Sequence, residues 1–211
     1  MGVGYNPRIV TDGLVLCLDA ANKRSYPGSG TTWTDRSANG YDGTLNNSPA
    51  ITDKAITLSS TNDYIEIPSV IQASTIDFWF NNPVATTGPV IYAGQDIFNS
   101  NNWQWCLFYH NATLFWRHDS GSFGTSLNNF TSTNTWHHFV MTRSSTGKVY
   151  IDGNHVSSNT STPPTVTGNI RIGKAGDAYW NGSVGALKLY NRVLTAKEIL
   201  QNYEATKGRY A

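Results

Sequence analysis

The sequence lacks the features that would point to nucleic acid or to a membrane. Charged residues make up only 14% of the chain, and 15 Lys and Arg almost balance 14 Asp and Glu. No basic run or cluster of arginines offers the positive surface that binding to a phosphate backbone requires. No apolar run approaches the ~20 residues that a membrane-spanning helix needs. We therefore expect no nucleic-acid partner and no membrane span.

Cysteine is scarce, and the N-terminus lacks the pattern of an export signal. The two cysteines, Cys17 and Cys106, both lie in apolar strand-like runs. They could pair, but two buried free thiols are the preferred interpretation. Residues 1–7 contain neither a charged segment nor an apolar one, so no signal peptide is expected. The sequence therefore predicts synthesis in a cytoplasm without export by that route.

The groups that catalysis needs are also missing. Glycoside hydrolysis requires two carboxylates across one bond, and the three glutamates are an expected helix cap (Glu198), a residue of the terminal helix (Glu204) and a lone strand residue (Glu66). There is no G-x-S-x-G elbow and no H-E-x-x-H or C-x-x-C spacing. His137 and His138 are neighbours on a strand, so their rings point to opposite faces. We expect a protein that is not an enzyme and requires no cofactor.

Aromatic residues and short alternating runs are abundant. Aromatics reach 12% of the chain, with seven tryptophans, and they fall mostly in runs typical of half-buried strands. Such runs lie at 14–19, 55–58, 64–67, 75–80, 90–93, 103–110, 114–117, 136–143, 148–154, 170–172 and 184–190. About twelve short strands and one helix predict an all-β fold, a sandwich of two antiparallel sheets.

Two connections between strands carry specific predictions. The runs 55–58 and 64–67 are separated by a polar turn at 59–63, and we interpret them as a pair of strands. The dipeptide Asp152–Gly153 favours the positive φ angles of a type I′ turn. A third strand is therefore expected to return through residues 155–156.

The phase of the apolar residues predicts which side chains share a face. Leu14, Leu16 and Leu18 alternate with polar or smaller residues, so they are expected on one face of a strand. Val184 is out of phase with the leucines that follow it in its own run. A β-bulge near Gly185–Ala186 would restore the phase.

The one helix predicted with several independent signals begins near Thr195. If Thr195 is the N-cap, its hydroxyl accepts from the amide of Glu198, and the Glu198 carboxylate accepts from the amide of Thr195. Leu194 and Ile199 then have the spacing of a hydrophobic staple. The helix is not expected to extend far past Gly208.

We interpret residues 13–211 as a single domain that follows an extended N-terminal arm over residues 1–12. The arm has little apolar content with which to build a core of its own. A long polar connection over residues 20–47 is expected to have a function or to be packed by its own aromatic residues. Those aromatic residues are Tyr26, Trp33 and Tyr41.

The C-terminal part of the sequence resembles a known family. Residues 182–199, GSVGALKLYNRVLTAKEI, are similar to the closing strand and helix of laminin-G-like, concanavalin-A-like jelly-roll domains. A Trp-His strand at 136–137 followed by Y-x-D-G at 150–153 also matches the family. Gly185 and Ala186 stand where the family usually has acidic residues. This departure argues against a cation or polar-contact role at those two positions, and the packing role that the resemblance implies for the segment is unaffected.

The opening segment resembles a narrower group. Residues 12–45, DGLVLCLDAANKRSYPGSGTTWTDRSANGYDGTL, are similar to the start of laminin-G-like proteins found among tailed-bacteriophage structural proteins. Together the two segments extend the resemblance over most of residues 12–203. It implies a concanavalin-A-like jelly-roll sandwich and a location in the virion.

The resemblance also raises the question of calcium. Many family members carry Ca²⁺ at the edge of the sandwich, and oxygen atoms of Asp and Asn suit this ion. The candidate ligands are Asn62 and Asp63 before one strand, and Asp177 and Asn181 in the loop before the last strand. Alternatively, these residues serve the turns, because Asn and Asp tolerate left-handed angles and bond their own backbone.

Exposed aromatic faces could bind a glycan. The first candidate platform is a set of strand residues, and the second is a loop pair, Tyr179 with Trp180. The strand residues are Trp103, Trp105, Tyr109 and Trp116. The alternative for the strand residues is simple core packing, and an exposed apolar patch at the loop pair would equally mark a protein contact.

Two hypotheses for function follow. The preferred one is a non-enzymatic phage virion protein, a capsid decoration protein that adheres to capsid or other virion proteins, with the arm of residues 1–12 lying along a neighbouring subunit. The alternative is a lectin-like module that attaches to host-surface or environmental glycans. The expected partners are therefore virion proteins, glycans or further copies of the chain, and Ca²⁺ is the only ion for which the sequence offers ligands.

Overall fold

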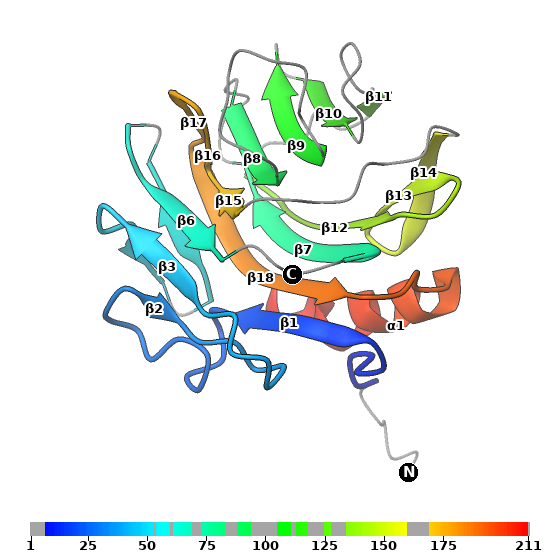
Figure 1. The fold of residues 1–211 in the computed structure, drawn as a ribbon, viewed down its shortest axis with the longest axis horizontal. Coiled ribbons are helices and arrows are strands. Elements are labelled where there is room, and N and C mark those ends of the chain that lie inside the picture. Colours follow the sequence, from blue (N-terminus) through cyan, green and yellow to red (C-terminus); the bar gives the residue numbers. More distant parts are fainter. Residues whose placement is uncertain are drawn as a thin grey trace.

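The computed structural model describes residues 7–52, 54–59, 61–68, 73–82, 88–93, 105–110, 113–117, 125–127, 134–159 and 169–210. These residues form a sandwich of two antiparallel sheets with one helix near the C-terminus (Figure 1). The fold class predicted from the sequence is confirmed. Cys17 and Cys106 are both buried and form no disulfide, as expected.

The first sheet carries the helix on its outer face, and we call it the helix-side sheet. Its strands run in the order β14-β13-β12-β7-β18-β5-β4, and β1 pairs with β18 off this path. Their bounds are β1 Leu14–Asp19, β4 Ala50–Ile51, β5 Ile56–Leu58, β7 Thr75–Asn81, β12 Trp136–Thr142, β13 Gly147–Ile151, β14 Asn154–Asn159 and β18 Gly182–Tyr190. Strand β7 lies between β12 and β18, in the middle of the sheet.

The second sheet has the order β11-β10-β9-β8-β15-β6-β3-β2. Its strands are β2 Thr32–Trp33, β3 Gly43–Asn46, β6 Tyr64–Ile67, β8 Gly88–Ala93, β9 Trp105–His110, β10 Thr113–Arg117, β11 Thr125–Leu127 and β15 Ile170–Ile172. A separate two-stranded ribbon, β16 Lys174–Ala175 with β17 Ala178–Tyr179, follows β15.

The main core lies between the two sheets. Alternate residues of each strand face inward, because successive side chains of a strand point to opposite sides. The core includes Phe78 and Leu187 from one sheet and Ile65, Ile170 and Leu107 from the other. Tyr26 and Trp33 are buried in it as well, and they pack the long connection over residues 20–47 as predicted.

Helix α1 (Ala196–Thr206) is followed by a 3₁₀ turn, Lys207–Arg209, and covers the outer face of the helix-side sheet. Thr195 is its N-cap, and the capping box with Glu198 is complete, which confirms the prediction. Leu194 and Ile199 pack together in one cluster, as a hydrophobic staple should. In the described part of the chain no helix is long and apolar enough to cross a membrane.

A second aromatic cluster lies on the same outer face. Trp79 stacks on Tyr210 with 4.5 Å between ring centroids, and Ala186 completes the buried group. Trp136 and Tyr203 pack against it. The last described residue is thus held against the helix-side sheet.

Two local predictions are confirmed. Asp152 and Gly153 have φ angles of 51° and 79°, and the chain returns from this turn into β14. The register of β18 against β7 shifts between Val184 and Ala186. This bulge brings Val184 into the main core together with Leu187, as the phase of the sequence indicated.

Two other predictions are wrong. Strands β5 and β6 do not pair, because β5 joins the helix-side sheet and β6 joins the second sheet. Their polar connection therefore crosses from one sheet to the other. Leu14 does not share a face with Leu16, because the register of β1 against β18 shifts between them and places Leu14 beside the helix cluster.

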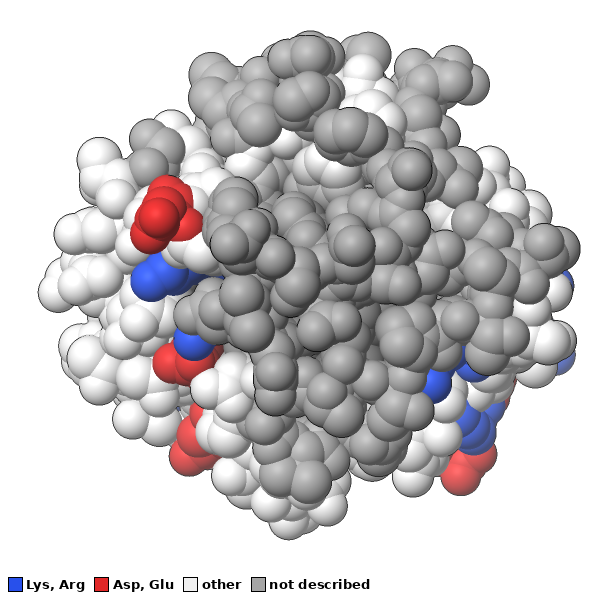
Figure 2. All heavy atoms as spheres, turned by 45° about the horizontal axis from the view of Figure 1, so that its top comes forward, with Lys and Arg blue, Asp and Glu red and all other residues white. Residues whose placement is uncertain are grey.

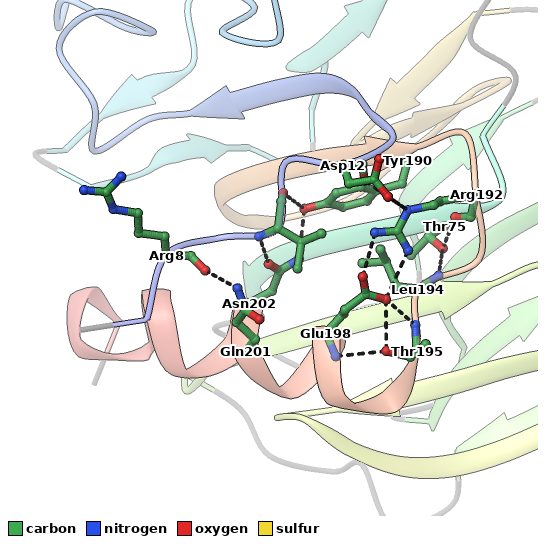
Figure 3. A network of polar contacts seen from close by, with 11 residues as sticks. Arg8, Asp12, Thr75, Tyr190, Arg192, Leu194, Thr195, Glu198, Gln201 and Asn202 are labelled. Carbon is green, nitrogen blue, oxygen red and sulfur yellow. Dashed lines mark hydrogen bonds and ion pairs between the residues drawn. The ribbon is translucent and has the colours of Figure 1, made fainter. Parts of the chain in front are cut away.

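Residues 7–12 are not a free arm. Val10 is only 8% exposed; its amide donates to Asn202 Oδ1 at 2.8 Å, and its carbonyl accepts from Tyr190 Oη at 3.0 Å. Gln201 Nε2 donates to the carbonyl of Arg8 at 2.7 Å (Figure 3). This part of the predicted arm is therefore bound to the chain's own helix, and residues 1–6 lie outside the described residues.

Candidate functional site

The outward face of the second sheet carries a row of polar side chains. Inward residues of β6 and β15, such as Ile65 and Ile170, belong to the core, so their neighbours in sequence point outward. Cross-strand register then places four outward residues side by side on four adjacent strands. These residues are Thr32, Thr44, Glu66 and Arg171.

Glu66 lies in the middle of this row and is tied to two donors. Its Oε1 atom accepts from Asn169 Nδ2 at 2.7 Å and from Arg171 Nη2 at 3.0 Å and Nε at 3.2 Å. The side chains of Glu66 and Arg171 are partly buried. The pair thus presents a fixed carboxylate and a planar guanidinium on one surface, and a charge-assisted contact of this kind is stronger than a neutral one.

A lysine held between two tyrosines lies next to this row. Tyr64 is outward on β6, two residues before Glu66. Lys174 Nζ lies 4.6 Å from the ring centroid of Tyr64 and 5.3 Å from that of Tyr179. Lys174 and Tyr179 are also cross-strand partners in the β16–β17 ribbon. An ammonium over an aromatic face is attracted to it, so both rings position the charge.

Trp180 explains why Tyr179 faces outward. The Trp180 side chain is fully buried, and its Nε1 donates to Asn82 Oδ1 at 2.8 Å. The backbone amide of Trp180 donates to the carbonyl of Gly173 at 2.9 Å. Gly182 allows the indole to lie directly on the backbone, since a Cβ at that position would be 2.0 Å from the ring. Trp180 therefore anchors the ribbon and leaves its neighbour on the surface.

We call this combined surface the sheet-face site. It consists of Thr32, Thr44, Asn46, Tyr64, Glu66, Asn169, Arg171, Lys174 and Tyr179. Of these residues, only Tyr179 was predicted to bind a ligand. Tyr64, Glu66 and Arg171 could have been found from the alternation in 64–67 and 170–172, because the residues that alternate with the buried isoleucines had to point outward. What the sequence could not show is that Lys174 meets both tyrosines.

The predicted aromatic platform on the strands is wrong for the residues that can be placed. Tyr109 is 1% exposed and Trp116 is 0% exposed, and both belong to the main core. Trp180, from the second platform, is likewise buried. The phase of β9 and β10 turns Tyr109 and Trp116 inward, whereas Trp180 lies in the loop between β17 and β18 and is directed into the core. The Trp105 side chain and the whole of Trp103 lie outside the described residues.

The predicted calcium ligands have roles in turns. Asp63 is buried, and its Oδ2 accepts from the amide of Ser59 at 3.0 Å. The carbonyl of Asn62 accepts from Asn47 Nδ2 at 2.7 Å. Asp177 is exposed in the turn between β16 and β17, and Asn181 immediately precedes β18. No group of three or more His, Cys, Asp or Glu side chains forms a metal site among the residues that can be placed. These observations fit the turn interpretation, and calcium stays a prediction.

His137, His138 and Glu198 serve the fold. His137 Nδ1 lies 2.8 Å from Asp152 Oδ2, in the β13–β14 turn, whereas His138 is buried beside Asp77 on the other face of β12. Glu198 binds Arg192 and caps the helix (Figure 3). The two imidazoles thus point apart, as expected.

A buried ionic cluster lies on the opposite side of the molecule, under helix α1. Asp77 Oδ1 lies 2.7 Å from Lys188 Nζ and 3.1 Å from His138 Nε2, and Asp77 Oδ2 accepts from Asn202 Nδ2 at 2.8 Å. Burial alone would raise the pKa of Asp77, but Lys188 and His138 outweigh it and hold that pKa well below its usual value. The cluster is closed to solvent, so its role is structural.

On the face shown in Figure 2, the charged residues that can be placed do not form a patch of one sign. Figure 2 shows described acidic and basic side chains lying next to one another on the face it presents. Among these described residues no extended positive region is visible, in agreement with the near-zero net charge of the chain.

Comparison with solved structures shows what the sandwich resembles. A Trypanosoma rangeli sialidase in complex with sialic acid superposes with a TM-score of 0.78 at 17% identity, over 98% of this chain and 35% of that one. The botulinum neurotoxin serotype D binding domain gives a TM-score of 0.70 at 17% identity, over 92% of this chain and 52% of that one. The chain therefore spans about a third to a half of these proteins, and the likeness concerns the fold.

Sequence comparison identifies the family. A search of curated proteins found no match. A family model of the laminin-G type, described as the concanavalin A-like lectin/glucanases superfamily, matches residues 58–200, which is more than half of the chain. The matched segment includes β6, β15 and the β16–β17 ribbon, and so most of the sheet-face site. The chain is a member of the concanavalin A-like lectin/glucanases superfamily.

Proposed function

We propose that this domain is a non-catalytic carbohydrate-binding module and that the sheet-face site binds the sugar. The observation that carries the proposal is the placement of Lys174, between Tyr64 and Tyr179 and next to the Glu66–Arg171 pair. These groups come from four strands, β6, β15, β16 and β17, and they are held by a buried tryptophan and by cross-strand pairs.

The chemistry of the site suits a sugar. Pyranose hydroxyls need donors and acceptors in fixed positions, and specificity in such sites comes from a few well-placed polar groups. Glu66 offers an acceptor, Asn169 and Arg171 offer donors, and the outward threonines of β2 and β3 continue the row. Tyrosine side chains add contact area at little cost in conformational entropy.

The superfamily and the fold support this assignment. The superfamily name covers lectins and glucanases, one of the structural neighbours is a sialidase in complex with sialic acid, and another is a toxin binding domain. The proposal stops at binding because hydrolysis needs two carboxylates. On the described strands of the sheet-face site, Glu66 is the only carboxylate, and it is bound to Arg171.

A glycan array followed by titration calorimetry tests the proposal. We expect saturable binding by the wild-type protein and its loss, by roughly tenfold or more, in Tyr64→Ala and in Glu66→Gln. Lys197→Gln on the exposed surface of α1 is the matched control and should bind normally. Absence of binding to every glycan, or binding that both site variants retain in full, would overturn the proposal.

A role in a phage particle is the second candidate. The observation that favours it is the resemblance of residues 12–45 to laminin-G-like proteins of tailed bacteriophages. A capsid decoration protein could present the sheet-face site outward and adhere to the particle by another surface. Particles purified from an infected host and labelled with an antibody to this chain would carry the label at regular positions. Label confined to the cell extract would reject a virion location.

A further inference from the structure

We infer that Lys174 recognises an anionic group, so that the ligand class of the sheet-face site is an acidic oligosaccharide carrying a carboxylate or a sulfate. This inference rests on the proposed carbohydrate-binding function and specifies the class of sugar. It assigns Lys174 as the residue that selects that class.

The positive charge of Lys174 is not paired with any described carboxylate, in contrast to that of its neighbour Arg171. In the described part of the chain no carboxylate lies within ion-pair distance of Lys174. Its neighbours are the faces of Tyr64 and Tyr179. Several other basic residues each have a carboxylate partner, namely Arg171, Lys188, Arg192, Lys207 and Arg209.

The two tyrosines position the ammonium without neutralising it. A ring quadrupole attracts a cation but carries no net charge, so the positive charge of Lys174 remains available to a ligand. The long lysine side chain normally samples many rotamers, and holding it in place in advance lowers the entropy that binding must remove. The result is a pre-positioned cation beside a row of hydrogen-bonding groups.

Nearby acids do not cancel this charge. Glu66 is already bound to Arg171 and Asn169. Asp177 lies in the turn beyond the Ala175–Ala178 pair, at the tip of the ribbon. Asp63 is buried and accepts from the amide of Ser59. An anionic group at Lys174 would therefore meet an ammonium that no described carboxylate occupies.

The geometry also indicates where the acidic group and the neutral hydroxyls of the ligand bind. The acidic group lies at Lys174, at the ribbon end of the site. The neutral hydroxyls of the same or the next sugar lie along Asn169, Glu66 and the threonine row. A neutral sugar can use the row but not the lysine, so charge is the feature that separates good ligands from poor ones.

Matched sugar pairs test the inference. The probes are 3′-sialyllactose with lactose, trigalacturonic acid with galactotriose, and 6-sulfated with unsulfated N-acetyllactosamine, each titrated into the wild-type protein. We expect at least one acidic member to bind roughly tenfold more tightly than its neutral partner. The pair that shows the difference distinguishes carboxylate from sulfate. This preference should shrink as salt rises, because screening weakens the contact.

Variants of Lys174 test whether this residue causes the preference for acidic sugars. Lys174→Gln should bring the affinity for the acidic member down to that for the neutral one, and Lys174→Arg should retain most of the preference. Lys197→Gln should behave as the wild type, and thermal melting checks that every variant is folded.

Each outcome of these titrations either supports or overturns the inference about Lys174. Equal affinity for acidic and neutral members, or an equal loss for both in Lys174→Gln, would overturn the inference and leave the carbohydrate proposal standing. Binding to no sugar of either kind would overturn both. Preference for the acidic member that Lys174→Gln leaves intact would place the anion site elsewhere and also reject the inference.

Discussion

Lys188 Nζ lies 2.7 Å from Asp77 Oδ1 in the space between the helix-side sheet and helix α1, where both side chains are almost wholly buried. The pair is cross-strand, since Asp77 on β7 is the register partner of Lys188 on β18. Asn202 from the helix supplies a further hydrogen bond to Asp77 and also accepts from the amide of Val10. One buried charge thus connects the sheet, the helix and the N-terminal segment.

Removing this charge should destabilise the protein strongly. Asp77→Asn leaves Lys188 buried without a compensating anion, and breaking a buried pair in this way costs about 3–5 kcal/mol. Urea denaturation measures the loss in the free energy of unfolding. The double variant Asp77→Leu with Lys188→Met should recover much of that loss, because a buried ion pair can be replaced by packed apolar residues at little net cost. A single variant as stable as the wild type would show that the pair has no such role.

The helix cap should make stability depend on pH. Hydrogen bonds from Arg192 and then from the amide of Thr195 hold the pKa of Glu198 at about 2. Because the folded pKa lies below the unfolded value of ~4.3, the charged carboxylate stabilises the protein above that value, and this contribution is lost as pH falls toward about 2.

We therefore expect Glu198→Gln to be less stable than the wild type by about 1 kcal/mol near neutral pH. The difference should shrink through the window from ~pH 4.3 down to about 2. Glu204→Gln, in a surface pair with Lys207, is the control and should change little. Unfolding curves at a series of pH values give both differences, and a gap that stays constant down to the lowest pH would contradict the assignment.

The buried indole of Trp180 should be essential for the ribbon. Trp180→Ala removes a large fully buried ring and its hydrogen bond to Asn82, which costs about 3–5 kcal/mol. Tyr179→Ala, its neighbour on the surface, should cost less than about 1 kcal/mol. Thermal melting compares the two. Similar losses from both substitutions would mean that the ribbon is not anchored by Trp180.

The N-terminal segment should contribute to stability. Deleting residues 1–12 removes the buried Val10 side chain and the hydrogen bonds to Asn202, Tyr190 and Gln201, so we expect a loss of about 2–4 kcal/mol. Arg8→Ala is the control, since the carbonyl of Arg8 makes the contact and the residue itself is exposed. Equal stability of the deleted and full-length chains would restore the free-arm interpretation for residues 7–12.

Local chemistry in the sequence predicted those features that depend on neighbouring residues. The capping box at Thr195 and Glu198, the turn at Asp152–Gly153 and the bulge near Gly185 each follow from a few consecutive side chains, and each is confirmed. The alternation of the strands was also sufficient to predict a sandwich of two sheets.

Sheet membership and surface exposure could not be predicted in the same way. A strand with two possible partners gives no local sign of its choice, so β5 and β6 were wrongly paired. Burial of Tyr109, Trp116 and Trp180 depends on which face of the strand or loop turns inward. The meeting of Lys174 with Tyr64 joins residues more than a hundred positions apart, and only the folded chain brings them together.

Residues 7–10 and Tyr210 both lie on the outer face of the helix-side sheet, across the sandwich from Lys174. A carrier, bead or sensor chip joined at either end of the described chain would be attached on the side of the molecule opposite the sheet-face site. Lys174 and its two tyrosines would then point toward the solution, and an immobilised sample would keep the proposed binding surface accessible without any redesign.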